Sequence, residues 1–265
     1  MVRMKLGEHE VVLSFGSSGA HDEWISLFPH VELSGGDETC GQLHIRLESG
    51  YGSAFAGYEI ERSRTEDGAT YLVRADYATR LDADYRAATI HYYDQLALKH
   101  ALMHVYSMLI VQRGWGLLLH ASCVDEYGGG HLFAGPSGAG KSTAAALSQP
   151  RGLYADEASI VKIESGRVTV YHSPFRSELH TPLAEQLAPA PLQSIQLLHQ
   201  SLTNERTQMK KSVALLALMD KVFYWSPTPE AAGTIMRLLK QLVESVPTYD
   251  LYFRKDPTFW ELMDR

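Results

Sequence analysis

The amino-acid sequence predicts a mixed α/β (α+β) protein in two parts. Residues 1–93 contain several short runs in which polar and apolar residues alternate, which is the pattern of half-exposed strands. Residues 94–265 contain longer runs with helical spacing, and between two of them lies the segment Gly-Pro-Ser-Gly-Ala-Gly-Lys-Ser at residues 135–142. We therefore expect a strand-rich N-terminal domain over residues 1–93 and a second domain over residues 94–265.

The composition is that of a folded, globular protein and excludes several function classes. Of 265 residues, 45% are hydrophobic and 21% are charged, and the formal net charge is -7 with no Lys/Arg run, which argues against a nucleic-acid surface. Cys40 and Cys123 are far apart, so neither a zinc site nor a disulfide framework is indicated. No signal-peptide core and no run of ~18 apolar residues is present. We expect a cytoplasmic protein without a membrane partner.

The N-terminal part is predicted to form an antiparallel, half-exposed sheet. Gly, Ser and Asp clusters separate its strands. Lone histidines in such strands are more often surface or core residues than ligands. We therefore interpret this part as a recognition or support domain for an unknown ligand. The expected strands are residues 11–15, 42–47, 58–61, 70–74 and 88–92.

The second part is predicted to begin with a linking helix and to continue with a hairpin that leads into residues 135–142. A glycine-rich turn at residues 125–130 separates the two strands of this hairpin. A proline-rich stretch, residues 182–191, is expected to be irregular. The expected helices are residues 94–113, 143–147, 211–219, 229–246 and 256–263, and the expected strands are residues 116–124, 131–134, 152–163, 168–171, 194–199 and 246–253.

The segment at residues 135–142 fits the phosphate-loop pattern G-x-x-x-x-G-K-[ST] at every fixed position. Its glycines let the backbone adopt positive φ and approach phosphate oxygens closely. Lys141 would reach the terminal phosphates, and the Ser142 hydroxyl would bind Mg²⁺. The alternative, a glycine-rich turn that binds nothing, fits the flanking strand and helix less well. The predicted nucleotide-binding residues are Gly135, Pro136, Ser137, Gly138, Ala139, Gly140, Lys141, Ser142 and Thr143.

Two adjacent acids, Asp156 and Glu157, lie in the next predicted strand, where both can face the loop. In a phosphate-loop site one carboxylate holds Mg²⁺, directly or through water, and another accepts a proton from an attacking hydroxyl. The alternative is a solvated pair without a catalytic role. The position after the loop favours the catalytic interpretation.

Three further residues are candidates for the same site. His120 interrupts an apolar strand beside the loop, where it could pair with Asp156 and tune that carboxylate as a base; a hydrogen-bonded core histidine is the alternative. Arg176 and Glu178 lie in a polar loop, where the guanidinium could neutralise a transferring phosphate and the acid could bind the metal. A plain solvated loop is equally compatible with the pattern.

These residues carry a resemblance to a known family. The order of His120, the loop with Lys141 and the acids Asp156 and Glu157 resembles the catalytic domain of HPr kinase/phosphorylase. That family has an unusual phosphate-loop fold that also occurs in phosphoenolpyruvate carboxykinase. The resemblance therefore implies an HPr-kinase/phosphoenolpyruvate-carboxykinase-like P-loop kinase domain, with its specific motifs over about residues 110–180.

The C-terminal tail carries a second resemblance. Residues 246–260 resemble HPr-kinase-like proteins that are found beside peptide-modifying gene sets. Some members of that group phosphorylate a serine of a ribosomally made precursor peptide, as in lasso-peptide tailoring. The resemblance thus implies a peptide or small-protein substrate with an acceptor serine. HPr kinases are commonly hexameric, so it also implies a homo-oligomer.

The resemblance assigns roles to the individual residues. Lys141 and Ser142 would bind the phosphates of ATP and Mg²⁺, Asp156 would be the base with His120 as its partner, and Glu157 would assist the metal. Glu157 stands where the family normally has aspartate. The family's glycine-rich segment for phosphorolysis is not recognisable around residues 176–178, so the resemblance does not extend to a reverse phosphorylase activity. The N-terminal strands also differ from those of the bifunctional enzyme, so the resemblance does not extend to HPr as partner.

The leading hypothesis is an ATP- and Mg²⁺-dependent kinase that phosphorylates a serine hydroxyl of a peptide or small protein. A non-catalytic ATP-binding regulator is a second hypothesis, which predicts ATP binding without transfer. A small-molecule kinase or a carboxykinase-like enzyme is a third, which predicts a closed pocket lined by arginine rather than an open groove beside the loop.

Overall fold

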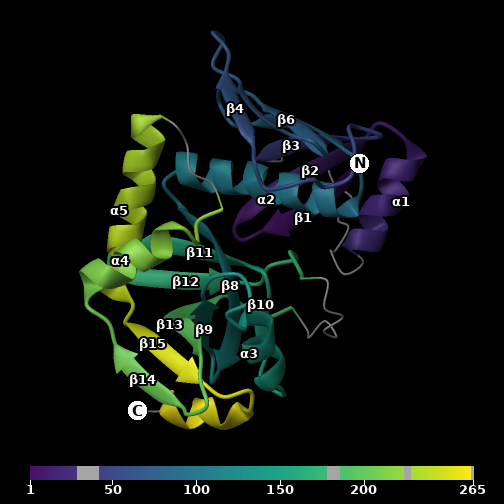
Figure 1. Ribbon diagram of the computed structural model, residues 1–265. Helices are drawn as coiled ribbons and strands as arrows, with labels where there is room; N and C mark the ends of the chain where they lie inside the picture. Colours follow the sequence, from purple (N-terminus) through teal and green to yellow (C-terminus); the bar gives the residue numbers. More distant parts are fainter. Residues whose placement is uncertain (29–41, 178–185, 224–227, 264–265) are drawn as a thin grey trace. The chain divides into compact units, whose positions relative to one another are not determined.

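The computed structural model describes residues 1–28, 42–177, 186–223 and 228–263, and the chain forms two compact units (Figure 1). Unit 1 is Met1–Leu109 and unit 2 is Ile110–Arg265. The division lies within helix α2 (Gln95–Gln112), later than the boundary expected after residue 93. Each unit combines helices with its own β-sheet, which confirms the predicted α/β class.

Unit 1 contains a seven-stranded sheet in the order β1-β2-β3-β7-β6-β5-β4. The sequence-based expectation of a purely antiparallel sheet is wrong, because β2 pairs with β3 and β3 pairs with β7 in parallel. The remaining pairs are antiparallel. The strands are β1 (Val2–Leu6), β2 (His9–Phe15), β3 (Leu43–Ser49), β4 (Glu61–Arg64), β5 (Thr70–Arg74), β6 (Tyr77–Leu81) and β7 (Ala87–Tyr92).

Helix α1 (Ser18–Leu27) explains how a parallel β2–β3 pair is possible in unit 1. Parallel neighbours need a crossover connection, and α1 follows β2 and contacts both β2 and β3. The Ser17 hydroxyl caps the helix by accepting the Ala20 N–H at 3.2 Å. Only Ala20 and Trp24 of this helix are buried, so it has no long apolar stripe and was missed in the sequence.

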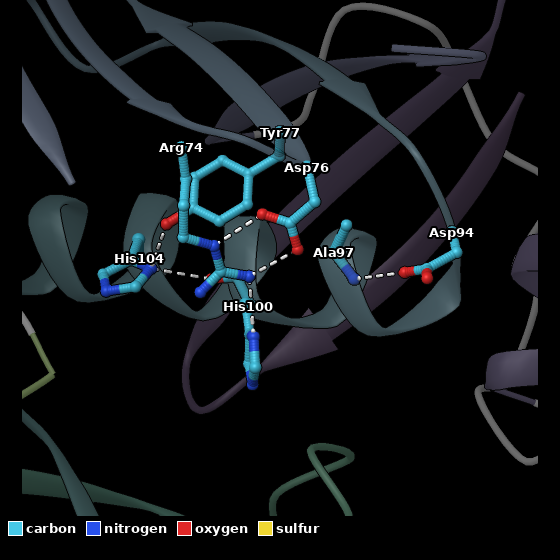
Figure 2. A network of polar contacts seen from close by, with 7 residues as sticks. All are labelled: Arg74, Asp76, Tyr77, Asp94, Ala97, His100 and His104. Carbon is cyan, nitrogen blue, oxygen red and sulfur yellow. Dashed lines mark hydrogen bonds and ion pairs between the residues drawn. The ribbon is translucent and has the colours of Figure 1, made fainter. Parts of the chain in front are cut away.

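A buried polar network joins the β5–β6 hairpin of unit 1 to α2 (Figure 2). The Arg74 guanidinium donates to both carboxylate oxygens of Asp76, at 2.6 and 2.7 Å, and to His100 Nδ1 at 2.9 Å. Burial and the Arg74 charge lower the pKa of His100 to about 3. A neutral His100 is thus the form that accepts from Arg74. His104 Nδ1 lies 3.1 Å from the Tyr77 hydroxyl.

Unit 2 contains an eight-stranded sheet in which β8 forms an antiparallel hairpin with β9 and β9 pairs in parallel with β13. The predicted hairpin before the loop is therefore confirmed. β13 pairs in parallel with β15. The strands are β8 (Gly116–Glu126), β9 (Gly129–Ala134), β10 (Leu153–Ala155), β11 (Ala158–Glu164), β12 (Arg167–Tyr171), β13 (Ala190–Gln200), β14 (Glu205–Gln208) and β15 (Thr248–Phe253).

Helices cover both faces of the central strands of this sheet. Alternate residues of β9 belong to different clusters: Leu132 packs in the same core as α4 and α5, and Phe133 packs in the same core as α3 and η1. The same alternation holds for Leu197 and Leu198 of β13. The loop after β9 is thus held between two packed layers. The helices are α3 (Lys141–Leu147), α4 (Lys211–Met219), α5 (Pro229–Ser245) and the 3₁₀ helix η1 (Pro257–Leu262).

Three expectations for unit 2 need correction. The single strand expected at residues 152–163 is two strands, β10 and β11, with Asp156 and Glu157 between them. The stretch expected to be irregular at residues 182–191 already contains the start of β13 at Ala190, and residues 182–185 lie outside the described part. β14 was not expected at all. Within the described residues, no helix is long and apolar enough to span a membrane.

Candidate functional site

The loop at residues 135–142 connects β9 to α3, and its backbone requires its glycines. Gly138 and Gly140 have φ of 79° and 105°, values that favour glycine. A Cβ at Gly140 would also lie 2.8 Å from Cζ of Phe253. Gly135 does not have a positive φ, but a Cβ there would lie 2.7 Å from the Cβ of Ala139. The fixed glycines thus satisfy the close packing and the turns that a phosphate loop needs.

Lys141 bends back over this loop. Its ammonium donates to the carbonyl oxygens of Gly135 and Pro136, at 3.0 and 3.2 Å. Partial burial and the positive charge of Lys221 lower the pKa of Lys141 below its usual value, whereas the carboxylates of Glu157 and Asp220 act in the opposite direction. Lys141 therefore lies among charged side chains that come from two other segments of the chain.

His120 of β8 lies beside the start of the loop, because Ala121 pairs with Ala134, the last residue of β9. Burial, and then the charges of Lys141 and Lys221, lower the pKa of His120 to about 4. The imidazole is therefore neutral at neutral pH. Its ring centroid lies 5.5 Å from that of Phe223.

Asp156 is buried, with 3% of its surface exposed, and its carboxylate is held by the loop that follows β12. Ser177 donates to it twice, from the backbone N–H at 3.1 Å and from the hydroxyl at 2.8 Å. Arg176 Nη1 lies 4.0 Å from Asp156 Oδ1. Among the described residues no hydrogen bond or ion pair joins Asp156 to His120. The structure thus brings Arg176, not His120, to this carboxylate.

The strand β8 connects the loop to the two acids. The Ser122 hydroxyl donates to the Lys141 carbonyl at 3.1 Å, and the Ala121 N–H donates to the Glu157 carbonyl at 3.1 Å. β10 and β11 pair with successive parts of β8, and Asp156 and Glu157 lie between these two strands. The loop and the acid pair therefore lie on either side of β8, which pairs with β9 along one edge and with β10 and β11 along the other.

The oxygen groups around Lys141 suit Mg²⁺ chemistry. Ser142 is the second residue of α3 and follows Lys141, and the Glu157 carboxylate raises the pKa of Lys141 against the larger effect of burial. Mg²⁺ prefers oxygen ligands and commonly takes one or two from the protein and the rest from phosphates and water. A ready-made cluster of three or more His, Cys, Asp or Glu side chains is absent from the described residues. Glu178, the third predicted metal ligand, lies outside them.

Lys221 is a candidate site residue that the sequence gave no reason to select. Residues 220–223 run along β8: Val222 bridges to Leu119, and the Lys221 carbonyl accepts the His120 N–H at 2.7 Å. The Lys221 side chain is 8% exposed and pairs with Asp220 at 2.6 Å. No motif marks this segment, and only the fold places it beside His120.

The sheet, the loop and the surrounding charges define an α/β protein with a phosphate-loop motif. Within that class, the family model of the SynChlorMet cassette protein ScmC matches residues 87–265, so the chain belongs to this family. No curated protein matches the chain.

Among solved structures, the Hpr(Ser) kinase/phosphatase from Coxiella burnetii is similar at 10% identity and a TM-score of 0.32, over 56% of this chain and 91% of that chain. At this TM-score the likeness supports no conclusion about residues or activity. A role in lasso-peptide tailoring stays a prediction.

Proposed function

We propose that this protein is an ATP-dependent kinase that transfers the γ-phosphoryl group to a serine hydroxyl of a peptide or small protein. One observation carries the proposal: a loop with the full phosphate-loop pattern and a buried carboxylate that accepts a serine hydroxyl both adjoin strand β8 of one sheet. A phosphate loop alone fits many classes, but phosphoryl transfer to a hydroxyl also needs a group that takes the proton.

Asp156 is the proposed base. Its carboxylate already accepts the Ser177 hydroxyl at 2.8 Å, so a serine side chain fits against it. An acceptor serine would take a comparable position, and its oxygen would bond to the γ-phosphorus while the bond between that phosphorus and the leaving oxygen of ADP breaks. The hydroxyl proton would pass to Asp156.

Lys141 and the loop backbone are proposed to hold the donor. The Lys141 ammonium would exchange its bonds to the carbonyls of Gly135 and Pro136 for bonds to phosphate oxygens. Ser142 and Glu157 would hold Mg²⁺, which when bound neutralises charge on the phosphates. Arg176, whose guanidinium lies 4.0 Å from Asp156 Oδ1, is proposed to face the transferred group.

The acceptor is proposed to be a peptide. The family description names a cassette protein, so peptides encoded in the same gene cassette are the first acceptor candidates. Cytoplasmic location and a homo-oligomeric state are part of the same proposal.

The direct test is transfer of labelled phosphate from ATP to such a peptide by the purified full chain. We expect transfer in the presence of Mg²⁺ and a loss of about 10²- to 10⁴-fold in Asp156→Asn, which keeps the shape but not the base. Asp84→Asn, at an exposed aspartate of unit 1, is the matched control and should transfer normally.

Two outcomes would contradict the proposal. Transfer that survives Asp156→Asn would remove the base from Asp156. ATP binding with no transfer to any peptide of the cassette would favour the non-catalytic regulator.

A further inference from the structure

The Ser177 hydroxyl already lies at the carboxylate that is proposed to be the base. It donates to Asp156 Oδ2 at 2.8 Å, and the Ser177 N–H donates to Asp156 Oδ1 at 3.1 Å, so one residue holds both carboxylate oxygens. A general base must lie within about 2.6–3.2 Å of the hydroxyl whose proton it takes. Ser177 therefore meets the distance requirement for an acceptor before any peptide binds.

The contacts of the segment after β12 fix Ser177 in this place. The Ser173 N–H donates to the Tyr154 carbonyl at 2.8 Å, which ties the segment to β10. Phe175 is fully buried, and its N–H donates to the Ser173 hydroxyl at 3.3 Å. Since Asp156 directly follows β10, these contacts lead the segment along that strand and bring Ser177 to the carboxylate.

The phosphate donor would bind close to this serine. On β8, the Ser122 hydroxyl donates to the Lys141 carbonyl, and the N–H of the preceding residue, Ala121, donates to the Glu157 carbonyl. Consecutive residues of one strand thus contact the end of the phosphate loop and the pair of acids. The phosphates of the donor and the serine at the proposed base would therefore share one site.

The surroundings of Ser177 favour transfer to its oxygen. Ser177 is partly exposed, so a bound ligand can reach it, whereas Asp156 is 3% exposed. The Arg176 guanidinium lies 4.0 Å from Asp156 Oδ1 and would balance negative charge on a phosphoryl group that moves to the neighbouring serine. An acceptor that belongs to the same chain also needs no binding step of its own, which raises its effective concentration.

We propose that Ser177 is a site of self-phosphorylation: without a peptide, the protein transfers the γ-phosphoryl group of ATP to its own Ser177 hydroxyl. This inference rests on the proposed function, because it uses the same donor and the same base. The Ser177 oxygen bonds to the γ-phosphorus, the bond between that phosphorus and the leaving oxygen of ADP breaks, and the hydroxyl proton passes to Asp156. The products are ADP and a phosphoserine, which has no hydroxyl left to donate to Asp156.

The test incubates the purified full chain with labelled ATP and Mg²⁺ in the absence of any peptide and locates the label by tandem mass spectrometry. We expect the label on Ser177, at a rate per molecule that does not depend on protein concentration, as a reaction within one chain requires. Ser177→Ala should reduce the label about tenfold or more, whereas Ser177→Thr, which keeps a hydroxyl, should still be labelled. Ser212→Ala, at an exposed serine of α4, is the matched control and should be labelled like the wild-type protein.

The outcomes separate this inference from the proposed function. Label on a serine other than Ser177, or a rate that rises in proportion to protein concentration, would overturn the inference. An unlabelled chain that nevertheless phosphorylates a peptide of the cassette would also overturn it, and the proposed function would stand. If neither the chain nor a peptide is labelled, both are wrong. A fall of about 10²-fold or more in Asp156→Asn would support transfer to Ser177 through this base.

Discussion

The buried network around Arg74 in unit 1 and the charged groups around Lys141 in unit 2 each contain a cationic side chain, but the two cations have different partners. The Arg74 side chain is 3% exposed, and its guanidinium forms three hydrogen bonds, two to Asp76 and one to His100 (Figure 2). Lys141 donates to two backbone carbonyls, and among the described residues no carboxylate lies within ion-pair distance of it. The charge of Arg74 is thus paired with a carboxylate inside the protein, whereas the charge of Lys141 is available to bind an anion.

This difference separates a role in stability from a role in binding. A buried charge that has all its partners contributes to function only through the folded state, and removing one partner leaves the other uncompensated. A cation that bonds to its own loop carbonyls can exchange them for phosphate oxygens. Variants of the two sites should therefore have opposite signatures in unfolding and in binding.

The largest effect is expected from Arg74→Met. It leaves the carboxylate of Asp76 buried without its cation, so the free energy of unfolding should fall by about 3–5 kcal/mol in urea. Arg46→Met is the control: its partner Glu48 is bonded at 2.5 Å, but the Arg46 side chain is 58% exposed, so the loss should stay below about 1 kcal/mol. Equal losses of unfolding free energy in both variants would show that the buried network stabilises the fold no more than an exposed ion pair does.

The next effect is expected from Lys141→Met. Phosphate transfer should fall about 10²- to 10³-fold, because a charge that stabilises the transferring group is lost. The free energy of unfolding should change little, since Lys141 bonds to backbone carbonyls and forms no ion pair with any residue that the structure describes. Lys210→Met, an exposed lysine of the same unit, is the control. A large loss of unfolding free energy with normal phosphate transfer would show that Lys141 acts in stability and not in binding.

The parts of the fold that follow from short-range patterns could be predicted from the sequence. The β8–β9 hairpin, the loop and α5 each have their signals within a few neighbouring residues: a glycine-rich turn, the fixed loop positions, and a proline with an apolar stripe. The parallel pairing of β2, β3 and β7 could not be predicted, because strand order depends on contacts between distant segments.

The candidate site divides in the same way. The loop residues and the two acids could be selected as candidates from the sequence, because the loop has a fixed pattern and the acids follow it at short range. The partners of Asp156 were not found, since Ser177 reaches it only after the β11–β12 hairpin folds back. Lys221 was missed for the same reason: an isolated bridge to β8, and no local pattern, places it beside His120.

A third prediction concerns pH and the buried network of unit 1. The pKa of His100 is lowered from 6.5 to about 3 in the folded protein. Between these pH values the unfolded chain binds a proton at His100 that the folded chain does not bind. The free energy of unfolding therefore falls as the pH falls below 6.5. From pH 7.5 to 5.0 this histidine should cost about 2 kcal/mol of unfolding free energy. The free energy of unfolding in urea should be measured at both pH values. Between them, the His100→Asn variant should lose about 2 kcal/mol less than the wild-type protein. An unchanged pH dependence would contradict the neutral His100.

The smallest effect, expected from Lys221→Met, decides to which kind of site Lys221 belongs. Its pair with Asp220 resembles the buried network of unit 1, but Asp220 is 70% exposed, so breaking the pair leaves a hydrated carboxylate at little cost. Its charge also lowers the pKa of Lys141, which indicates two cations near one site. We expect tripolyphosphate binding about tenfold weaker, or about 1.4 kcal/mol, with unfolding nearly unchanged and Lys210→Met as the control. Normal binding with a clear loss of stability would instead make Lys221 a structural residue of the segment that bridges to β8.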